Sequence, residues 1–390
     1  MEHDLREAFM DLGFEEGMGN PLDERELSEY VEEIPSLTPL QISEQLAEHG
    51  YVGQEKPRRS MSLMAFRHVQ RLRYIHLDKV PVEELPPKSN HLLVGPTGCG
   101  KTYMVETLFR HILDLPTVLV DITTYSETGY VGQDVTSILT RLLYAADGDV
   151  GRAEMGIVCL DEFDKIASGQ NNAVFAGAGT TKDISGLGVQ RELLKLLEST
   201  TVTVPTEFSH SSYQQHLLMS TTNIPFVACG AFSGLKLVTH LFNKEPHIGF
   251  TAKTASQAPR EIAVSFRQEE MDQTRNFQQY GFLPELIARF DRVIPFRALD
   301  EETLMMILRQ NLLSSYKREF ELAGVDLVVD KSVLERVVKQ ALKRETGARG
   351  LRSTLAYMLE DAAFEIYSEP GLKRVEVAYK NGEVFVKTDG

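Results

Sequence analysis

The feature that most constrains the fold of this 390-residue chain is the segment at residues 95–102, Gly-Pro-Thr-Gly-Cys-Gly-Lys-Thr. It matches the full pattern G-x-x-x-x-G-K-[ST], in which glycines let successive backbone N–H groups turn toward phosphate oxygens. An apolar run at 91–94 precedes the segment, and apolar residues at helical spacing follow it between 104 and 112. The pattern therefore predicts a strand, a phosphate-binding loop and a helix whose positive end faces the bound anion.

This loop predicts ATP and Mg²⁺ as cofactors. The residues expected to bind the nucleotide are Gly95, Pro96, Thr97, Gly98, Cys99, Gly100, Lys101 and Thr102. The Lys101 ammonium would reach the terminal phosphates, and the Thr102 hydroxyl would be a ligand of Mg²⁺. A second apolar run at 156–160 ends in Asp161 and Glu162. Ligands collect at the carboxyl ends of parallel strands, so Asp161 is the second expected Mg²⁺ ligand and Glu162 the expected base that activates water.

Composition excludes several classes of protein. The net charge is −15, and residues 1–33 alone contain 12 acidic and 2 basic residues. The rest of the chain has no large positive excess, which argues against a nucleic-acid partner. No apolar run approaches the roughly 18 residues of a membrane helix, and no apolar leader opens the chain. The three cysteines are scattered and have no zinc-ligand spacing, so we expect no zinc and a reducing, cytoplasmic compartment.

The order of expected elements predicts an α/β protein. Strands at 91–94, 117–121 and 156–160 alternate with helices, and this βαβ rhythm predicts a parallel sheet covered by helices. From residue 301 the pattern becomes helical, and a hairpin is expected around residues 375–386. We therefore expect an acidic arm at 1–35, solvated or weakly helical, a large ATPase domain at 36–299, and a smaller, mainly helical α+β domain at 300–390.

Besides the phosphate-binding loop, five segments at 51–54, 123–135, 183–190, 282–290 and 346–353 carry motifs in a fixed order along the chain. In this order they resemble the motifs of ClpX-like proteins, a family of ring-forming AAA+ ATPases, and the resemblance runs from about residue 37 to about residue 386. A related protease ATPase family, HslU, shares several of them but fits the loop sequences less well. The resemblance implies a homohexamer that unfolds protein substrates by ATP hydrolysis and threads them through an axial pore.

The resemblance also implies roles for individual residues. Tyr51 and Val52 would pack against adenine, Arg289 would reach the nucleotide of a neighbouring subunit, and Arg349 would contact the nucleotide of its own subunit. The residues of a pore loop that grips the substrate would be Gly129, Tyr130, Val131 and Gly132. The residues of a loop that docks into a ClpP-like peptidase would be Ile248, Gly249 and Phe250.

The chain departs from the family pattern in three places. It has no paired Cys-x-x-Cys zinc motif, and His210-Ser211-Ser212 stand where the family has a basic Arg-Lys-His loop. The first sensor is open between two alignments: either 224–228 is the fourth strand of the sheet, or the strand is 217–220 and Asn223 is the sensor. Two other functions compete with the peptidase-linked unfoldase, namely a stand-alone remodeller of protein complexes and a non-catalytic nucleotide-binding scaffold.

Overall fold

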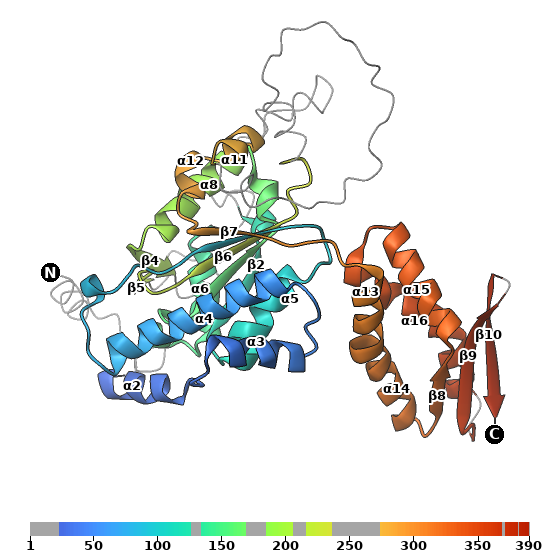
Figure 1. The fold of residues 1–390 in the computed structure, drawn as a ribbon. Coiled ribbons are helices and arrows are strands. Elements are labelled where there is room, and N and C mark those ends of the chain that lie inside the picture. Colours follow the sequence, from blue (N-terminus) through green and yellow to red (C-terminus); the bar gives the residue numbers. More distant parts are fainter. Residues whose placement is uncertain are drawn as a thin grey trace, which may run out of the picture.

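A computed structural model describes residues 23–125, 134–168, 185–205, 216–235, 274–368, 371–380 and 382–389 of the chain. We call the part that contains the five-stranded sheet the large domain and the part from α13 onward the small domain (Figure 1). The helices of the large domain are α2 (Glu24–Glu33), α3 (Pro39–Glu48), α4 (Glu55–His76), η1 (Val82–Glu84), α5 (Lys101–Glu106), η2 (Thr107–Ile112), η3 (Ile122–Thr124), α6 (Ser137–Ala145), α7 (Val150–Ala153), η4 (Phe163–Ile166), α8 (Ser185–Leu197), α11 (Thr274–Tyr280) and α12 (Pro284–Ile287).

The central sheet of the large domain is parallel, with strand order β2-β3-β6-β1-β7. Its strands are β1 (His91–Val94), β2 (Thr117–Asp121), β3 (Ile157–Asp161), β6 (Phe226–Gly230) and β7 (Arg292–Pro295). A separate antiparallel pair is formed by β4 (Thr201–Pro205) and β5 (His216–Ser220). The predicted α/β fold with a parallel sheet is confirmed.

Successive residues of each central strand face opposite sides of the sheet, so both sides are apolar. In β1, Leu92 and Val94 belong to the core beneath α6, α8 and α12, whereas Leu93 belongs to the core beneath α3, α4 and α5. Helices therefore cover both faces of the sheet (Figure 1). This arrangement leaves the carboxyl ends of the strands open at one edge.

Residues 24–33 of the arm that we expect to be solvated or weakly helical form helix α2, which packs against α4. Asp23 caps its first turn in a capping box with Glu26. Val31 is fully buried and Ile34 nearly so, and both join the core on the α4 side of the sheet. These two apolar side chains attach the helix to the core, although most of the arm is acidic.

The small domain packs helices against a three-stranded sheet. Its helices are α13 (Glu301–Ile307), η6 (Leu308–Leu312), α14 (Leu313–Leu322), α15 (Lys331–Lys343) and α16 (Gly347–Ser368), and its strands are β8 (Asp326–Val329), β9 (Arg374–Lys380) and β10 (Glu383–Asp389). The predicted hairpin is β9–β10, and β8 adds in parallel to β9. The domain has a core of its own, separate from the two cores of the large domain.

In chain order, the fourth strand of the central sheet is β6, and this decides between the two alignments of the first sensor. Pro225 lies just before β6, so the strand's own hydrogen bonds are not interrupted. The competing run at 216–220 is β5, outside the central sheet. Asn223 precedes β6 at the amino-terminal edge, where its Oδ1 accepts a hydrogen bond from Arg71 Nε at 2.9 Å. The alignment that makes Asn223 the sensor is therefore wrong.

Candidate nucleotide-binding and catalytic site

The phosphate-binding loop joins β1 to α5 as the sequence predicts. Gly98 and Gly100 have φ angles of +74° and +93°, in the left-handed region that glycine adopts without a Cβ penalty. Lys101 is the first residue of α5 and is buried. Its Nζ donates hydrogen bonds to the carbonyl oxygens of Gly95 at 2.6 Å and Pro96 at 3.0 Å. The ammonium group therefore lies inside the curve of the loop, where bound phosphates would replace those carbonyls.

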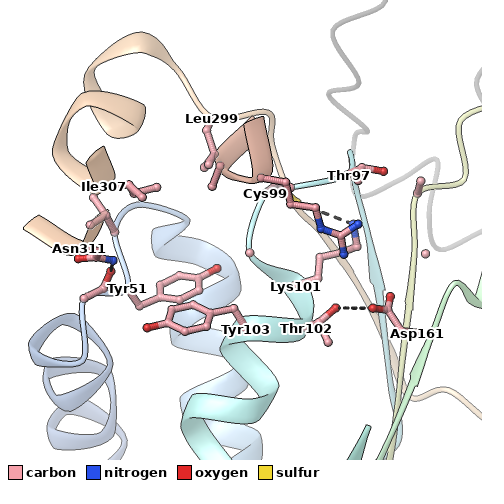
Figure 2. Close-up of a pocket in the computed structure, with 18 of the residues that line it drawn as sticks. Tyr51, Thr97, Cys99, Lys101, Thr102, Tyr103, Asp161, Leu299, Ile307 and Asn311 are labelled. Atoms are coloured by element: carbon pink, nitrogen blue, oxygen red, sulfur yellow. Dashed lines mark hydrogen bonds between the residues drawn. The ribbon is translucent and has the colours of Figure 1, made fainter. Parts of the chain in front are cut away.

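The two oxygen groups expected to hold Mg²⁺ are in contact. The Thr102 hydroxyl donates a hydrogen bond to Asp161 Oδ2 at 2.9 Å, across the open edge of the sheet (Figure 2). Asp161 Oδ1 accepts from the backbone N–H of Glu162 at 2.9 Å. A hydroxyl and a carboxylate side by side are the donor set that Mg²⁺ uses beside phosphate oxygens, so these residues fit that ion.

Two tyrosines form the other end of the site. The rings of Tyr51 and Tyr103 are stacked, with centroids 6.0 Å apart and an interplanar angle of 12° (Figure 2). The Tyr103 hydroxyl donates to the carbonyl oxygen of His49 at 2.8 Å. The Tyr51 hydroxyl is buried without a hydrogen-bond partner among the described residues, and burial raises its pKa well above the usual value. This pair makes a flat, largely apolar wall beside Val52, which suits a purine base.

The small domain closes the site over this wall. Asn311 Nδ2 donates a hydrogen bond to the carbonyl oxygen of Gly50 at 2.8 Å. At the phosphate end, the backbone N–H of Ala348 donates to the carbonyl oxygen of Gly98 at 3.0 Å. Arg349 lines the same cavity. The site is therefore formed by both domains, and their contacts bracket it at the two ends.

One cavity unites most of the predicted site residues. It is lined by Gly50, Tyr51, Val52, Thr97, Gly98, Cys99, Gly100, Lys101, Thr102, Tyr103, Asp161, Glu162, Gly230, Ala231, Leu299, Ile307, Asn311, Ala348 and Arg349. Gly95 and Pro96 contribute through their carbonyl bonds to Lys101. The lining residues that sequence reasoning did not predict are Gly50, Tyr103, Gly230, Ala231, Leu299, Ile307, Asn311 and Ala348. Tyr103 directly follows the loop motif and was open to inference, whereas nothing in the sequence marks Leu299 or the small-domain residues Ile307 and Asn311.

Arg289 lies away from this cavity. Its carbonyl oxygen accepts a hydrogen bond from Asn90 Nδ2 at 3.0 Å, and Asn90 precedes β1, whereas the phosphate-binding loop follows β1. Four residues of strand separate the two ends, which is roughly 13 Å. Arg289 is thus at the opposite edge of the sheet from the nucleotide site of its own chain.

The pore-loop and docking residues lie outside the described residues. They are Gly129, Tyr130, Val131, Gly132, Ile248, Gly249 and Phe250, together with His210, Ser211 and Ser212.

Known proteins are similar to this chain over most of its length. Residues 86–293 match the family described as the AAA domain (Cdc48 subfamily). The chain is 39% identical over 349 residues to the ATP-dependent Clp protease ATP-binding subunit ClpX of Azotobacter vinelandii, covering 86% of this chain and 76% of that protein. It is 37% identical over 348 residues to the protein of the same name from Treponema denticola, covering 88% of this chain and 80% of that protein. The chain belongs to the ClpX family of AAA+ ATPases.

Membership in the ClpX family makes this chain a Clp-type AAA+ chaperone ATPase that binds and hydrolyses ATP. Residues 299–377 also match the C-terminal, D2-small domain of ClpB protein, which agrees with the start of the small domain near α13. Within the described part of this ClpX-family chain, no helix is both long enough and apolar enough to cross a membrane.

Proposed function

We propose that this protein is a homohexameric unfoldase that threads protein substrates through an axial pore in the cytoplasm and delivers them to a ClpP-like peptidase. The observation that carries the proposal is the division of the ATPase machinery between two edges of the sheet. The nucleotide cavity is at one edge and Arg289 is at the other. A subunit with this layout needs a neighbour to complete its site, and a ring supplies one to every subunit.

We assign the chemistry of the site to four residues. Lys101 would bind the terminal phosphates, while Thr102 and Asp161 would hold Mg²⁺, which supplies positive charge to the phosphate oxygens. Glu162, beside Asp161 at the end of β3, would orient and deprotonate the attacking water. The contact between Thr102 and Asp161 at 2.9 Å supports this assignment, because it brings both proposed Mg²⁺ ligands together.

We assign the two arginines to different subunits. Arg349 lines the cavity of its own chain at the start of α16, so it would contact the nucleotide in cis. Arg289 would meet the charge that develops on the γ-phosphoryl group of the neighbour's nucleotide. Because Arg349 belongs to the small domain, loss of the γ-phosphate would alter the contact between the two domains and transmit hydrolysis to the ring.

The substrate and peptidase roles rest on the resemblance to ClpX. Tyr130, between Gly129 and Gly132, would face the pore and grip an extended chain through its aromatic ring, whatever the sequence of that chain. Phe250, after Ile248 and Gly249, would anchor the docking loop in a pocket of the peptidase. A stand-alone remodeller is the alternative, and lack of association with any co-expressed ClpP-type peptidase would favour it.

The variant Glu162→Gln tests the proposal, with Glu192→Gln on the surface of α8 as the control. We expect Glu162→Gln to bind ATP and form hexamers normally, but to hydrolyse ATP at least about 100-fold more slowly, because a catalytic base is lost. The control should match the wild type. A pull-down with Glu162→Gln in the presence of ATP should retain substrate proteins and the peptidase. Turnover near the wild-type rate would contradict the role of Glu162, and hexamers that retain no protein would contradict the unfoldase.

A further inference from the structure

The backbone at Arg289 and at Asp291, two residues later, is fixed by one buried residue, Asn90. All four polar groups of Asn90 are used. Its backbone N–H donates to Asp291 Oδ2 at 3.1 Å, and its carbonyl oxygen accepts from the Asp291 N–H at 2.9 Å. Its Nδ2 donates to the Arg289 carbonyl oxygen, and its Oδ1 accepts from the Phe226 N–H at 2.9 Å. Asn90 therefore ties the turn that bears Arg289 to the start of β6 in the central sheet.

The side chain of Arg289 has a separate partner. Its Nη2 donates to Glu198 Oε1 at 2.5 Å, in a pair whose side chains are 46% and 36% exposed. Within the described residues, Glu198 is the one side-chain partner of this guanidinium. The backbone is thus held by Asn90 and the guanidinium by Glu198, from different elements of the large domain.

Helix stability does not explain an acidic residue at the position of Glu198. Glu198 directly follows α8, at the end where the helix dipole is negative and a carboxylate is disfavoured. An exposed ion pair also contributes little to folding, typically below about 1 kcal/mol. The orientation that this carboxylate gives to Arg289 is a more direct reason for its presence.

We infer that Glu198 is a positioning residue for Arg289, holding the guanidinium in the orientation in which it reaches the nucleotide of the neighbouring subunit. The inference rests on the proposed function, since it needs Arg289 to act in trans. A guanidinium has five N–H donors in a planar fork, and one bond at Nη2 leaves the others free to meet phosphate oxygens. Glu198 therefore orients Arg289 without occupying all of its donors.

ATPase kinetics of Glu198 variants in the full-length protein test this inference. We expect Glu198→Ala to lower kcat about tenfold or more, since a small misplacement of a catalytic group costs this much. KM for ATP should change less than twofold, because Arg289 acts on charge that appears in the transition state. Glu198→Gln keeps the acceptor oxygen and should recover part of kcat.

Glu192→Ala is the matched control. It removes the Glu192–Lys195 pair, an ion pair at 2.7 Å on the same helix whose side chains are 29% and 66% exposed, and should leave kcat unchanged. The double variant Arg289→Ala/Glu198→Ala should equal Arg289→Ala alone. Glu198→Ala with a kcat within twofold of wild type, or above it, would overturn the inference. A Glu198→Gln variant with a kcat no higher than that of Glu198→Ala would also overturn it. So would a lower melting temperature and a loss of hexamers in Glu198→Ala large enough to account for the lower kcat.

Arg289→Ala separates the inference from the proposed function. We expect this variant to lose ATPase activity and mixed rings with Glu162→Gln subunits to regain some, because an arginine in trans serves the neighbouring site. If Arg289→Ala turns over ATP normally, or mixing never restores turnover, the trans role fails and the inference fails with it. If Arg289→Ala is inactive, mixing rescues it and Glu198→Ala is fully active, the function stands and only the role of Glu198 is overturned.

Discussion

Glu162 adopts a backbone conformation that residues other than glycine seldom adopt. Its φ angle is +54°, at the point where β3 ends and η4 begins. Such a conformation costs of order 1 to 3 kcal/mol and persists where the surroundings enforce it. Here its N–H is bound by the Asp161 carboxylate. The strained backbone turns the chain immediately after the two acidic residues, which keeps both at the open edge of the sheet.

Lys88 is a buried cation whose titration should be visible in the stability of the protein. Its Nζ donates to the Thr221 carbonyl oxygen at 2.7 Å and lies 4.9 Å from the centroid of the Phe226 ring. Burial, with a smaller contribution from the charge of Arg71, lowers its pKa from 10.5 to about 7. The folded chain therefore releases this proton at a lower pH than the unfolded chain.

We expect Lys88 to make the free energy of unfolding increase with pH between about 7 and 10.5. The variant Lys88→Met should lack this increase. In this window the unfolded state binds more protons at this site, so stability rises by up to about 1.4 kcal/mol per pH unit. Below pH 7 both states are protonated and the cost of the buried charge is fully present. Urea unfolding of wild type and variant at pH 7, 8 and 9 measures the difference, and Lys331→Met, at a side chain 74% exposed, is the control. Parallel pH profiles for wild type and Lys88→Met would contradict the assignment.

At the scale of elements, the start of α16 packs directly on the phosphate-binding loop. Gly347 has a φ angle of +56°, and a Cβ added there would lie 2.6 Å from the carbonyl oxygen of Gly98. The next residue, Ala348, donates its N–H to the same oxygen. Only glycine allows so close an approach in this conformation, so the small domain contacts the loop through backbone rather than side chains.

We expect Gly347→Ala to weaken ATP binding roughly fivefold, equivalent to about 1 kcal/mol, because the new methyl group would push α16 and Arg349 away from the loop. Gly324→Ala is the control for backbone strain alone. Gly324 also has a positive φ, +81°, but a Cβ there would meet nothing within 4 Å. Both variants should lose about 1 to 2 kcal/mol of stability from the left-handed conformation. Titration with a fluorescent ATP analogue should show the weaker affinity in Gly347→Ala only, and equal affinities would mean that the contact does not hold the site together.

At the scale of the whole molecule, Tyr130→Ala should separate ATP hydrolysis from unfolding. Because Tyr130 is proposed to face the pore and not the nucleotide, ATP turnover should persist while unfolding of a tagged test protein falls at least about tenfold, since a methyl group offers little contact area to hold a chain. If Tyr130 were instead a residue of the protein core, its substitution by alanine would lower the melting temperature, and hexamers, ATPase activity and unfolding activity would be lost together. Melting temperature, ATPase rate and unfolding rate from one preparation distinguish the two outcomes.

Phe250→Ala should weaken binding of the ClpP-like peptidase but leave the ATPase and unfolding activities intact. A docking anchor fails in association and not in chemistry, so ATPase activity and unfolding should stay near wild-type values while peptidase-coupled degradation is lost. Degradation of a fluorescent substrate with a ClpP-type peptidase measures this, and Phe385→Ala, an exposed residue of β10, is the control. Unchanged degradation by Phe250→Ala would contradict the docking role.

The sequence by itself determined those parts of the protein that are made of residues close together along the chain. The loop from Gly95 to Thr102 and the strand ending at Asp161 are each made of residues adjacent along the chain, so local spacing predicted the phosphate-binding loop and the proposed Mg²⁺ ligand. Alternating strands and helices likewise determined the parallel sheet, because parallel strands require crossover connections.

Only the tertiary structure decided which residues from distant segments meet. Asn311 contacts Gly50 across 261 positions of the chain, and Glu198 contacts Arg289 across 91, and neither pair has a local signature. The first sensor was undecided because two apolar runs of similar length compete for one strand, and only the central sheet selects between them. The mostly acidic sequence of α2 gave no sign that one of its faces is buried. Burial of that face depends on the helix it packs against, and the exposed acidic residues of α2 carry no information about that helix. Residues in one motif are brought together by backbone geometry, whereas residues of different elements are brought together when those elements pack on the hydrophobic cores.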